Sequence, residues 1–292
     1  MDALSCALLP DFCSLCGSPL PQLYPVPICD ACWTEFPAQS GPVCSRCGDT
    51  VDAARIGFES ASQALCRACR LAPPRFVRAV AYGPYQGRLK DAIHALKYDR
   101  LHPAAHGLGR MLAEAIAQLA SEAPSDLLVV PIPLHRTKLA QRGFNQARSL
   151  AAHALKFLSK SHPQWRLTLA SSTLMRLRAT DSQAGLTPHM RRINVRGAFS
   201  VSDPSAVTLK HVLLVDDIMT TGATARAAAQ ALMKAGAASV WVATLARARR
   251  MNGSGRGVST KDTDEIEDIA GNSPAAAIRE ASRLSSQDQR SF

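Results

Sequence analysis

One stretch of this sequence, residues 210–224, constrains the fold more than any other. Its run of apolar residues, rich in Val and Leu, is typical of a strand buried on both faces of a parallel sheet, although periodicity alone does not exclude a buried helical turn. Two carboxylates, Asp216 and Asp217, follow where that strand is expected to end, and a loop of small and hydroxylated residues comes next. An Ala-rich helix then runs to Gly236. This order predicts a ligand site at the carboxyl edge of an α/β sheet.

The chemistry of this stretch suits a phosphorylated sugar. Free backbone N–H groups in the loop, together with the helix dipole, favour a phosphate group. Two neighbouring aspartates suit sugar hydroxyls, or a Mg²⁺ ion held beside them. The alternative is a Walker-B-like acidic pair of another nucleotide enzyme. No G-x-x-x-x-G-K-[ST] pattern occurs in the chain, which counts against an NTPase.

Four C-x-x-C pairs occur in the first 70 residues. Two such pairs complete a tetrahedral Zn²⁺ site, so eight cysteines predict two structural zinc ions, with pairs combined either sequentially or in a cross-braced order. A disulfide scaffold would need an oxidising compartment, and a thioredoxin-like redox pair would be a single C-x-x-C on a βαβ unit. The expected zinc ligands are Cys13, Cys16, Cys29, Cys32, Cys44, Cys47, Cys66 and Cys69.

Length and composition allow one sizeable α/β domain and a smaller unit. The chain has 292 residues, of which 47% are apolar. It contains no run of eighteen apolar residues, so no membrane insertion is expected. Residues 1–4 lack the basic region of a secretory signal, and we therefore expect a cytoplasmic protein.

The positive charge of the chain is concentrated in its middle. The net charge is +11, and residues 76–200 hold 18 Lys and Arg against 6 Asp and Glu. Such a field favours polyanions, either a pyrophosphate ligand or nucleic acid, although a merely soluble basic surface is the alternative. Aromatic residues make up only 5% of the chain, which is few for the stacking platform usual in single-strand binders.

From residue 76 onward, strand and helix patterns alternate, which predicts a parallel sheet flanked by helices. Strands are expected at 76–82, at 127–130, from 174, at 212–215 and at 239–245. After the second of these, a loop over residues 131–138 carries Arg136 and Lys138. Basic side chains at the carboxyl end of a strand are well placed to bind a pyrophosphate.

The acidic stretch resembles the phosphoribosyl pyrophosphate (PRPP) motif of type I phosphoribosyltransferases. The resemblance implies that Asp216 and Asp217 hold the ribose hydroxyls and that Mg²⁺ accompanies PRPP. It implies that the loop after the first strand of the catalytic core, which is the strand expected at 127–130, binds the pyrophosphate. It also implies that residues 178–196 occupy the slot of a mobile loop covering the ligand. The residues implied to wrap the 5′-phosphate are Thr220, Thr221, Gly222, Ala223 and Thr224.

Further motifs occur in a fixed order along the chain. They are A-L-K-Y with Lys97, V-P-I-P from Val130, R-G-F-N-Q with Arg142, Asn145 and Gln146, T-D-S-Q-A-G-L with Gln183, and N-V-R-G-A-F from Asn194. Together with the cysteine pairs, they make residues 1 to about 248 resemble the ComF family. These are phosphoribosyltransferase-like proteins linked to DNA uptake in naturally competent bacteria, and some relatives are named for gluconate utilisation.

This resemblance leaves three functions open. The first is transfer of phosphoribosyl from PRPP to an unidentified acceptor with release of pyrophosphate. The second is a non-catalytic adaptor that handles single-stranded DNA with other proteins of the competence machinery. The third is a regulator that senses PRPP or a nucleotide. We expect a double zinc ribbon over 1–74, a phosphoribosyltransferase-like domain over 75–248 and a disordered tail over 249–292, because the tail has almost no large apolar residues.

Overall fold

The computed structural model describes residues 12–21, 24–51, 64–98, 101–179 and 188–249. Gln183 and the whole of its motif, residues 180–186, lie outside the described residues. The same holds for residues 250–292, so the expected tail also falls outside them.

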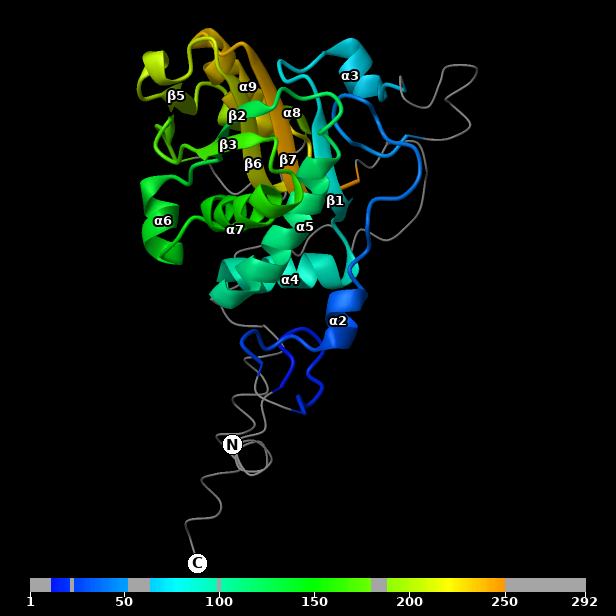
Figure 1. Ribbon diagram of the computed structural model, residues 1–292. Helices are drawn as coiled ribbons and strands as arrows, with labels where there is room; N and C mark the ends of the chain where they lie inside the picture. Colours follow the sequence, from blue (N-terminus) through cyan, green and yellow to red (C-terminus); the bar gives the residue numbers. More distant parts are fainter. Residues whose placement is uncertain (1–11, 22–23, 52–63, 99–100, 180–187, 250–292) are drawn as a thin grey trace, which may run out of the picture.

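A five-stranded parallel sheet forms the centre of the molecule (Figure 1). The strand order is β1-β7-β6-β2-β3, and each neighbouring pair is parallel. The predicted fold class, a parallel sheet flanked by helices and preceded by a Cys-rich segment, is confirmed. The strands are β1 (Ala79–Pro84), β2 (Asp126–Pro131), β3 (Arg166–Leu169), β6 (His211–Met219) and β7 (Ser239–Arg247).

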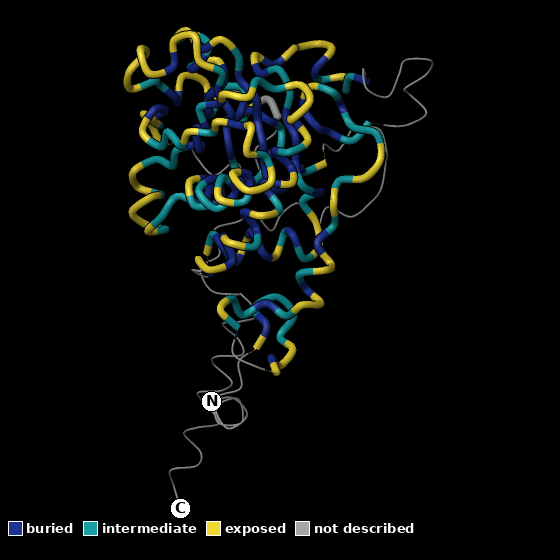
Figure 2. Tube along the Cα trace, in the orientation of Figure 1, coloured by how far each residue is buried: buried dark blue, intermediate teal, exposed yellow. Residues whose placement is uncertain are grey.

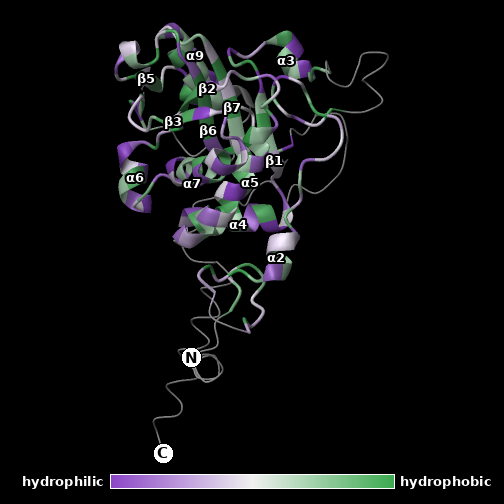
Figure 3. Ribbon diagram, viewed as in Figure 1, coloured by the Kyte–Doolittle hydropathy of each residue, from purple (hydrophilic) through white to green (hydrophobic). Residues whose placement is uncertain are grey.

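Helices cover both faces of the sheet. Successive side chains of a strand point to opposite faces, so β6 contributes Val212 and Leu214 to one core and Leu213 and Val215 to the other. The first core packs against α9 (Ala223–Lys234), and the second packs against α5 (Ala105–Ala117) and α7 (Gln146–Ser161). The buried residues concentrate in the strands (Figure 2), which are also the most hydrophobic part of the chain (Figure 3).

Shorter elements surround these layers. They are α2 (Asp30–Thr34), α3 (Arg67–Leu71), α4 (Gly87–Tyr98), η3 (His102–Ala104), α6 (Arg136–Arg142), α8 (Pro188–Val195), η4 (Pro204–Ala206) and an antiparallel pair formed by β4 (Leu174–Arg176) and β5 (Phe199–Val201). Within the described ranges, none of the helices has the length and apolar character needed to cross a membrane.

Two expectations about the strands were wrong. The apolar segment from Leu174 pairs with β5 in a separate two-stranded sheet, so it is not a strand of the core. The core strand at that point of the chain is β3, which the sequence did not reveal. Because β3 is a four-residue edge strand whose side chains alternate between exposed and half-buried, it lacks the apolar run that marks the central strands.

The central strand β6 is also longer than expected. Asp216 and Asp217 do not follow its end but lie within it, because β7 continues to pair with β6 as far as Met219. On its other side, the pairing with β2 stops at Val215. The acidic pair therefore projects beyond the end of β2. The chain order reverses between β2 and β6, and ligands of open α/β sheets bind at such a switch point.

Candidate functional site

The acidic pair is held by a lysine from α4. The Nζ atom of Lys97 lies 3.0 Å from Oδ2 of Asp217, and both side chains are largely buried. The backbone N–H of Asp217 donates a hydrogen bond of 2.9 Å to Oδ1 of Asp216. Desolvation, and then the negative charge of Asp217, raise the pKa of Asp216 to about 7. A ligand that offers hydroxyls or a cation to this pair would relieve that electrostatic cost.

The loop after β6 is short and leads directly into a helix. Gly222 has a φ of 73°, in the left-handed region that L side chains rarely adopt, and α9 begins at the next residue. The backbone N–H of Ala223 donates to Oγ1 of Thr221 over 3.3 Å. The predicted phosphate-binding residues Thr220 to Thr224 thus lie at the start of a twelve-residue helix, beside the acidic pair.

Arg136 and Lys138 lie in the first turn of α6, not in the loop expected from the sequence. His135 starts this helix, because its ring nitrogen accepts a hydrogen bond from the backbone N–H of Thr137. Arg136 is exposed and Lys138 is half-buried. Cations at the positive end of a helix dipole are unfavourable, and a bound anion would relieve that repulsion.

Two of the family motifs meet beside the acidic pair. The guanidinium of Arg142 lies 5.0 Å from the centre of the Tyr98 ring and donates to the Tyr98 hydroxyl over 3.1 Å. It also donates to Oε1 of Gln146 over 3.4 Å. Tyr98 is the neighbour of Lys97, so side chains of the A-L-K-Y and R-G-F-N-Q motifs are in contact with one another. Gln146 is only 1% exposed, and its Nε2 has no hydrogen-bond partner within the described part of the chain.

Asn145, of the R-G-F-N-Q motif, connects two backbone segments near these residues. Its Oδ1 accepts from the backbone N–H of Arg148 and caps α7, while its Nδ2 donates to the carbonyl oxygen of Ile132 over 3.0 Å. Asn145 therefore fixes the segment between β2 and α6 to the start of α7. The position of Arg136 and Lys138 depends on this segment.

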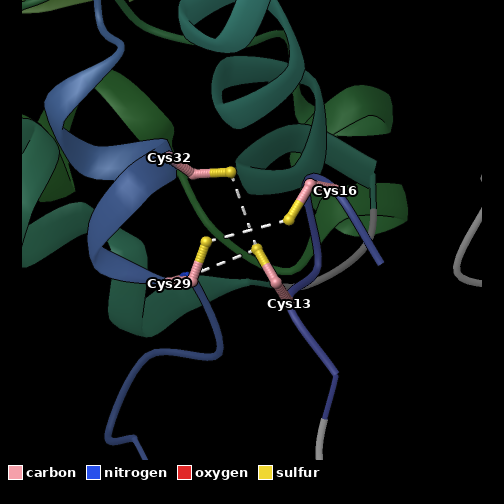
Figure 4. Close-up of side chains that lie close together, drawn as sticks. All are labelled: Cys13, Cys16, Cys29 and Cys32. Atoms are coloured by element: carbon pink, nitrogen blue, oxygen red, sulfur yellow. Dashed lines mark hydrogen bonds between the residues drawn. The ribbon is translucent and has the colours of Figure 1, made fainter. Parts of the chain in front are cut away.

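The first four cysteines, Cys13, Cys16, Cys29 and Cys32, form one cluster (Figure 4). The Sγ atoms of Cys16 and Cys29 are 3.7 Å apart, and those of Cys13 and Cys32 are 3.8 Å apart. Zinc bonds of about 2.3 Å in a tetrahedron give sulfur–sulfur distances of roughly 3.8 Å, so the four thiols fit a zinc ion. The hydroxyl of Ser18 lowers the pKa of Cys16 to about 6, which favours the thiolate that binds metal. We call these four residues the first cluster.

The second cluster consists of Cys44, Cys47, Cys66 and Cys69. The Sγ atoms of Cys47 and Cys66 are 3.6 Å apart, and hydrogen bonds from the other thiols, first from Cys47, lower the pKa of Cys44. Three of the four side chains are buried. The pairs thus combine sequentially, and the cross-braced alternative is excluded. Two sites of four cysteines each are consistent with two structural zinc ions.

The second cluster touches a buried arginine that the sequence analysis did not single out. Arg247, at the end of β7, is 3% exposed and lies 3.3 Å from Oδ2 of Asp49. Its Nε donates to the carbonyl oxygen of Cys47 over 3.1 Å, and its Nη1 donates to the carbonyl oxygens of Met219, over 2.7 Å, and Thr220. In the sequence, the only indication that Arg247 is important is that a charged residue stands at the end of an apolar strand.

Two family models match this chain in the expected order. A double zinc ribbon domain matches residues 4–70, and a phosphoribosyl transferase domain matches residues 145–276. The DNA utilization protein YhgH of Escherichia coli strain K12 is 32% identical over 241 residues, which are 82% of this chain and 98% of that relative. This chain belongs to the ComF family. Its ComF relatives also include Competence protein F of Haemophilus influenzae, which is 27% identical over 76% of this chain and 90% of that protein.

A more distant ComF relative is Competence protein ComFC of Bacillus subtilis, which is 24% identical over 227 residues, or 75% of this chain and 84% of that protein. In this ComF chain, most of the residues predicted in the core domain fall into three groups. The acidic pair and Lys97 lie together, residues 220–224, here called the phosphate loop, lead from the end of β6 into α9, and Arg142 and Gln146 lie beside Tyr98. Arg136 and Lys138 lie apart from these groups in α6. The roles of these groups remain predictions.

Proposed function

We propose that this ComF protein binds PRPP with Mg²⁺ at the carboxyl edge of its sheet and acts in DNA uptake. The observation that carries the proposal is the position of Asp216 and Asp217. They lie past the end of β2, at the switch point of the sheet, and directly before a loop that turns into α9 at Gly222. Two carboxylates thus lie beside a loop that leads into a helix N-terminus, which supports binding of a sugar by the former and of a phosphate by the latter.

Each part of the site would bind one part of PRPP. Asp216 and Asp217 would hold the ribose hydroxyls, and residues 220–224 would surround the 5′-phosphate. Arg136 and Lys138, at the start of α6, would bind the pyrophosphate. Mg²⁺ would be held beside the acidic pair and the pyrophosphate, where it would neutralise the charge of the leaving group.

In transfer from this complex, the protein would supply positioning and charge stabilisation. The acceptor forms a bond to C1 of the ribose, the bond from C1 to the pyrophosphate oxygen breaks, and the electron pair leaves with pyrophosphate. A proton carried by the attacking atom of the acceptor passes to water or to the released pyrophosphate. The basic side chains of α6 would stabilise that leaving group. A regulator would bind PRPP in the same way without this step, so release of pyrophosphate separates the two functions.

A second candidate function is the handling of single-stranded DNA in the cytoplasm. It is supported by the names of the relatives, which refer to DNA utilization and competence, and by the excess of Lys and Arg over residues 76–200. Binding through such a surface would show little sequence preference and would weaken steeply with salt. A salt slope near zero would contradict this function and leave the positive charge to the phosphorylated ligand.

Calorimetric titration of PRPP and ribose 5-phosphate, each with Mg²⁺, tests the main proposal. The double variant Asp216→Asn/Asp217→Asn should lose PRPP binding, and its thermal melting serves as the control for folding. Arg136→Gln/Lys138→Gln should weaken PRPP more than ribose 5-phosphate, because only PRPP carries the pyrophosphate. PRPP binding by the double Asn variant with wild-type affinity would contradict the proposal. A screen of acceptors for pyrophosphate release then decides between transferase and sensor.

A further inference from the structure

One guanidinium group contacts both the second cluster and the phosphate loop. Arg247 donates to the carbonyl oxygen of Cys47, a cluster residue, and to the carbonyl oxygens of Met219 and Thr220, which lie where β6 ends and the loop begins. The bonds to Cys47 and Met219 are buried and the one to Thr220 is partly buried, since Arg247 is almost fully buried itself. A planar guanidinium with several donors in a fixed geometry can hold two backbone segments at one spacing.

A second arginine makes a parallel connection from the other end of the loop. Arg226 lies in the first turn of α9, and its Nη1 donates to the carbonyl oxygen of Ala72 over 2.7 Å. Its Nη2 lies 3.6 Å from Sγ of Cys69. Arg247, on β7, therefore connects the second cluster to the start of the phosphate loop. Arg226 connects the same cluster to α9, the helix that follows the loop.

The chemistry of a zinc site explains why arginines occupy these positions. A Zn²⁺ ion with four thiolates carries a net charge of about −2, and donors around the sulfurs stabilise it. Besides the contact of Arg226 with Cys69, Nη2 of Arg247 lies 3.9 Å from Sγ of Cys47. Two cations lie beside this cluster, and one of them, Arg247, is also paired with Asp49. Loss of the metal would remove the negative charge that attracts both guanidinium groups to the cluster, so their contacts with it would weaken.

We propose that the second cluster holds the phosphate loop in its binding conformation, with Arg247 as the positioning residue. Affinity for phosphorylated ribose then depends on metal at the second cluster and not on metal at the first. The part about affinity rests on the proposed PRPP site, whereas the coupling between the cluster and the loop is a property of the protein without ligand.

The chain offers a matched pair of variants for the test. Cys29, of the first cluster, and Cys66, of the second, are both half-buried, and each precedes a five-residue helix with nearly the same backbone angles, φ −70° and −67° and ψ 157° and 154°. Cys29→Ser and Cys66→Ser each remove the equivalent ligand from one cluster. Arg247→Lys keeps the charge but loses the planar fork, and Arg226→Gln, at a half-buried helix position, disturbs the core less.

Hydrogen exchange of the full chain, loaded with zinc and without PRPP, is the first measurement. Exchange over residues 219–224 should rise about tenfold in Cys66→Ser and Arg247→Lys, within the usual range of coupling between sites, and by less in Arg226→Gln. In Cys29→Ser it should stay within about twofold of wild type. Wild-type exchange of this segment in Cys66→Ser would overturn the proposal, and so would an equal rise in Cys29→Ser.

Zinc affinity is the second measurement, and it follows from reciprocity. If metal at the second cluster favours PRPP binding, PRPP must raise the zinc affinity of that cluster by the same factor. In competition with a chelator, PRPP with Mg²⁺ should therefore raise the zinc affinity of Cys29→Ser, which retains the second cluster, and leave that of Cys66→Ser unchanged. Equal zinc affinities with and without PRPP in Cys29→Ser, in protein shown to bind PRPP, would overturn the proposal. If wild type binds no PRPP, the proposed function fails, while hydrogen exchange still decides the coupling.

Discussion

The two cysteine clusters share a ligand set but differ in their surroundings. The first cluster belongs to the core on the face of α5 and α7, and the second belongs to the core on the face of α9. In Figure 1, α2 of the first cluster lies beyond α4, whereas α3 of the second lies at the opposite end of the molecule. The first reaches α4 through a half-buried arginine, Arg88, which donates to the carbonyl oxygen of Leu15. The second reaches the phosphate loop directly through buried Arg247.

Because of this difference, two clusters with the same four cysteine ligands contact different parts of the proposed PRPP site. The first cluster supports α4, and α4 supplies Lys97 to the acidic pair. The second cluster supports the loop beside that pair. A zinc ribbon that looks like a separate domain in the sequence therefore contributes to both cores of the folded chain. The four predictions below test how unequal the two contributions are.

The largest effect is expected when one cluster loses its metal. Cys44→Ser/Cys47→Ser should lower the melting temperature by about 10 °C or more, because it strips the metal from beside the buried Arg247–Asp49 pair. The variant keeps both partners of that pair, but loss of a structural metal removes several kcal/mol of folding free energy, and each kcal/mol corresponds to about 2–4 °C in a domain of 150–250 residues. Cys13→Ser/Cys16→Ser should cause a smaller fall. Scanning calorimetry, with one zinc per chain verified for each variant, checks this order. Equal falls in melting temperature would contradict the expectation that the second cluster stabilises the fold more than the first.

A smaller effect concerns the packing of the first cluster on α5. A Cβ atom added at Gly107 would lie 2.4 Å from the ring of Trp33. Gly107→Ala should therefore destabilise the protein by about 1–2 kcal/mol, because overpacking outweighs the gain in helix propensity. In a Trp33→Ala background the same substitution should stabilise it by up to about 1 kcal/mol. Chemical denaturation of the four proteins measures this reversal of sign. Additive effects would mean that Trp33 does not press on α5.

A third prediction concerns the acidic pair, Asp216 and Asp217, which lies between Lys97 of α4 and the phosphate loop. The pKa of Asp216 is raised from 3.8 to about 7, so the folded state keeps a proton that the unfolded state releases. Stability from this group is therefore present at low pH and lost as the pH rises from about 4 to about 7. Relative to Asp216→Asn, wild type should lose about 1 kcal/mol between pH 5 and pH 8, after allowance for its partial exposure.

Asp126→Asn is the control for this pH series, because Asp126 is 60% exposed and its ion pair is with the exposed Arg166. Its stability should follow that of wild type across the range. Denaturation midpoints at four or five pH values suffice for the comparison. A constant difference between wild type and Asp216→Asn would contradict the raised pKa.

The smallest effect is expected at the surface contact of the first cluster. Glu35→Gln should cost about 0.5 kcal/mol or less, because its ion pair with Arg88 is exposed to solvent. Arg88→Ala should cost about 1 kcal/mol, since it also leaves the half-buried carbonyl oxygen of Leu15 without its donor. The difference between the two variants, measured in one denaturation series, isolates the contact with Leu15. No difference would show that the ribbon is held by apolar packing alone.

The sequence predicted those features that depend on neighbouring residues. The apolar run of β6 and the spacing of the cysteine pairs are local, and both identified their elements. Features that depend on distant partners were missed. β3 is too short and too exposed to show an apolar run, and nothing near Arg247 in the sequence points to Cys47. Asp216 and Asp217 were placed after the strand, because the added length of β6 is set by β7 and not by its own residues.

The contact between Arg247 and Cys47 spans 200 residues, and this has a consequence for biosynthesis. Ribosomes add about 5–20 residues per second, so the cysteines emerge roughly 10–40 s before their arginine does. The second cluster can bind its ion early, yet it gains this hydrogen-bond donor only when β7 has been translated. A product truncated before Arg247 would bind metal at the second cluster but would lack the hydrogen bonds from Arg247 to Met219 and Thr220. The geometry of the ligand site is thus established only after β7 has been translated.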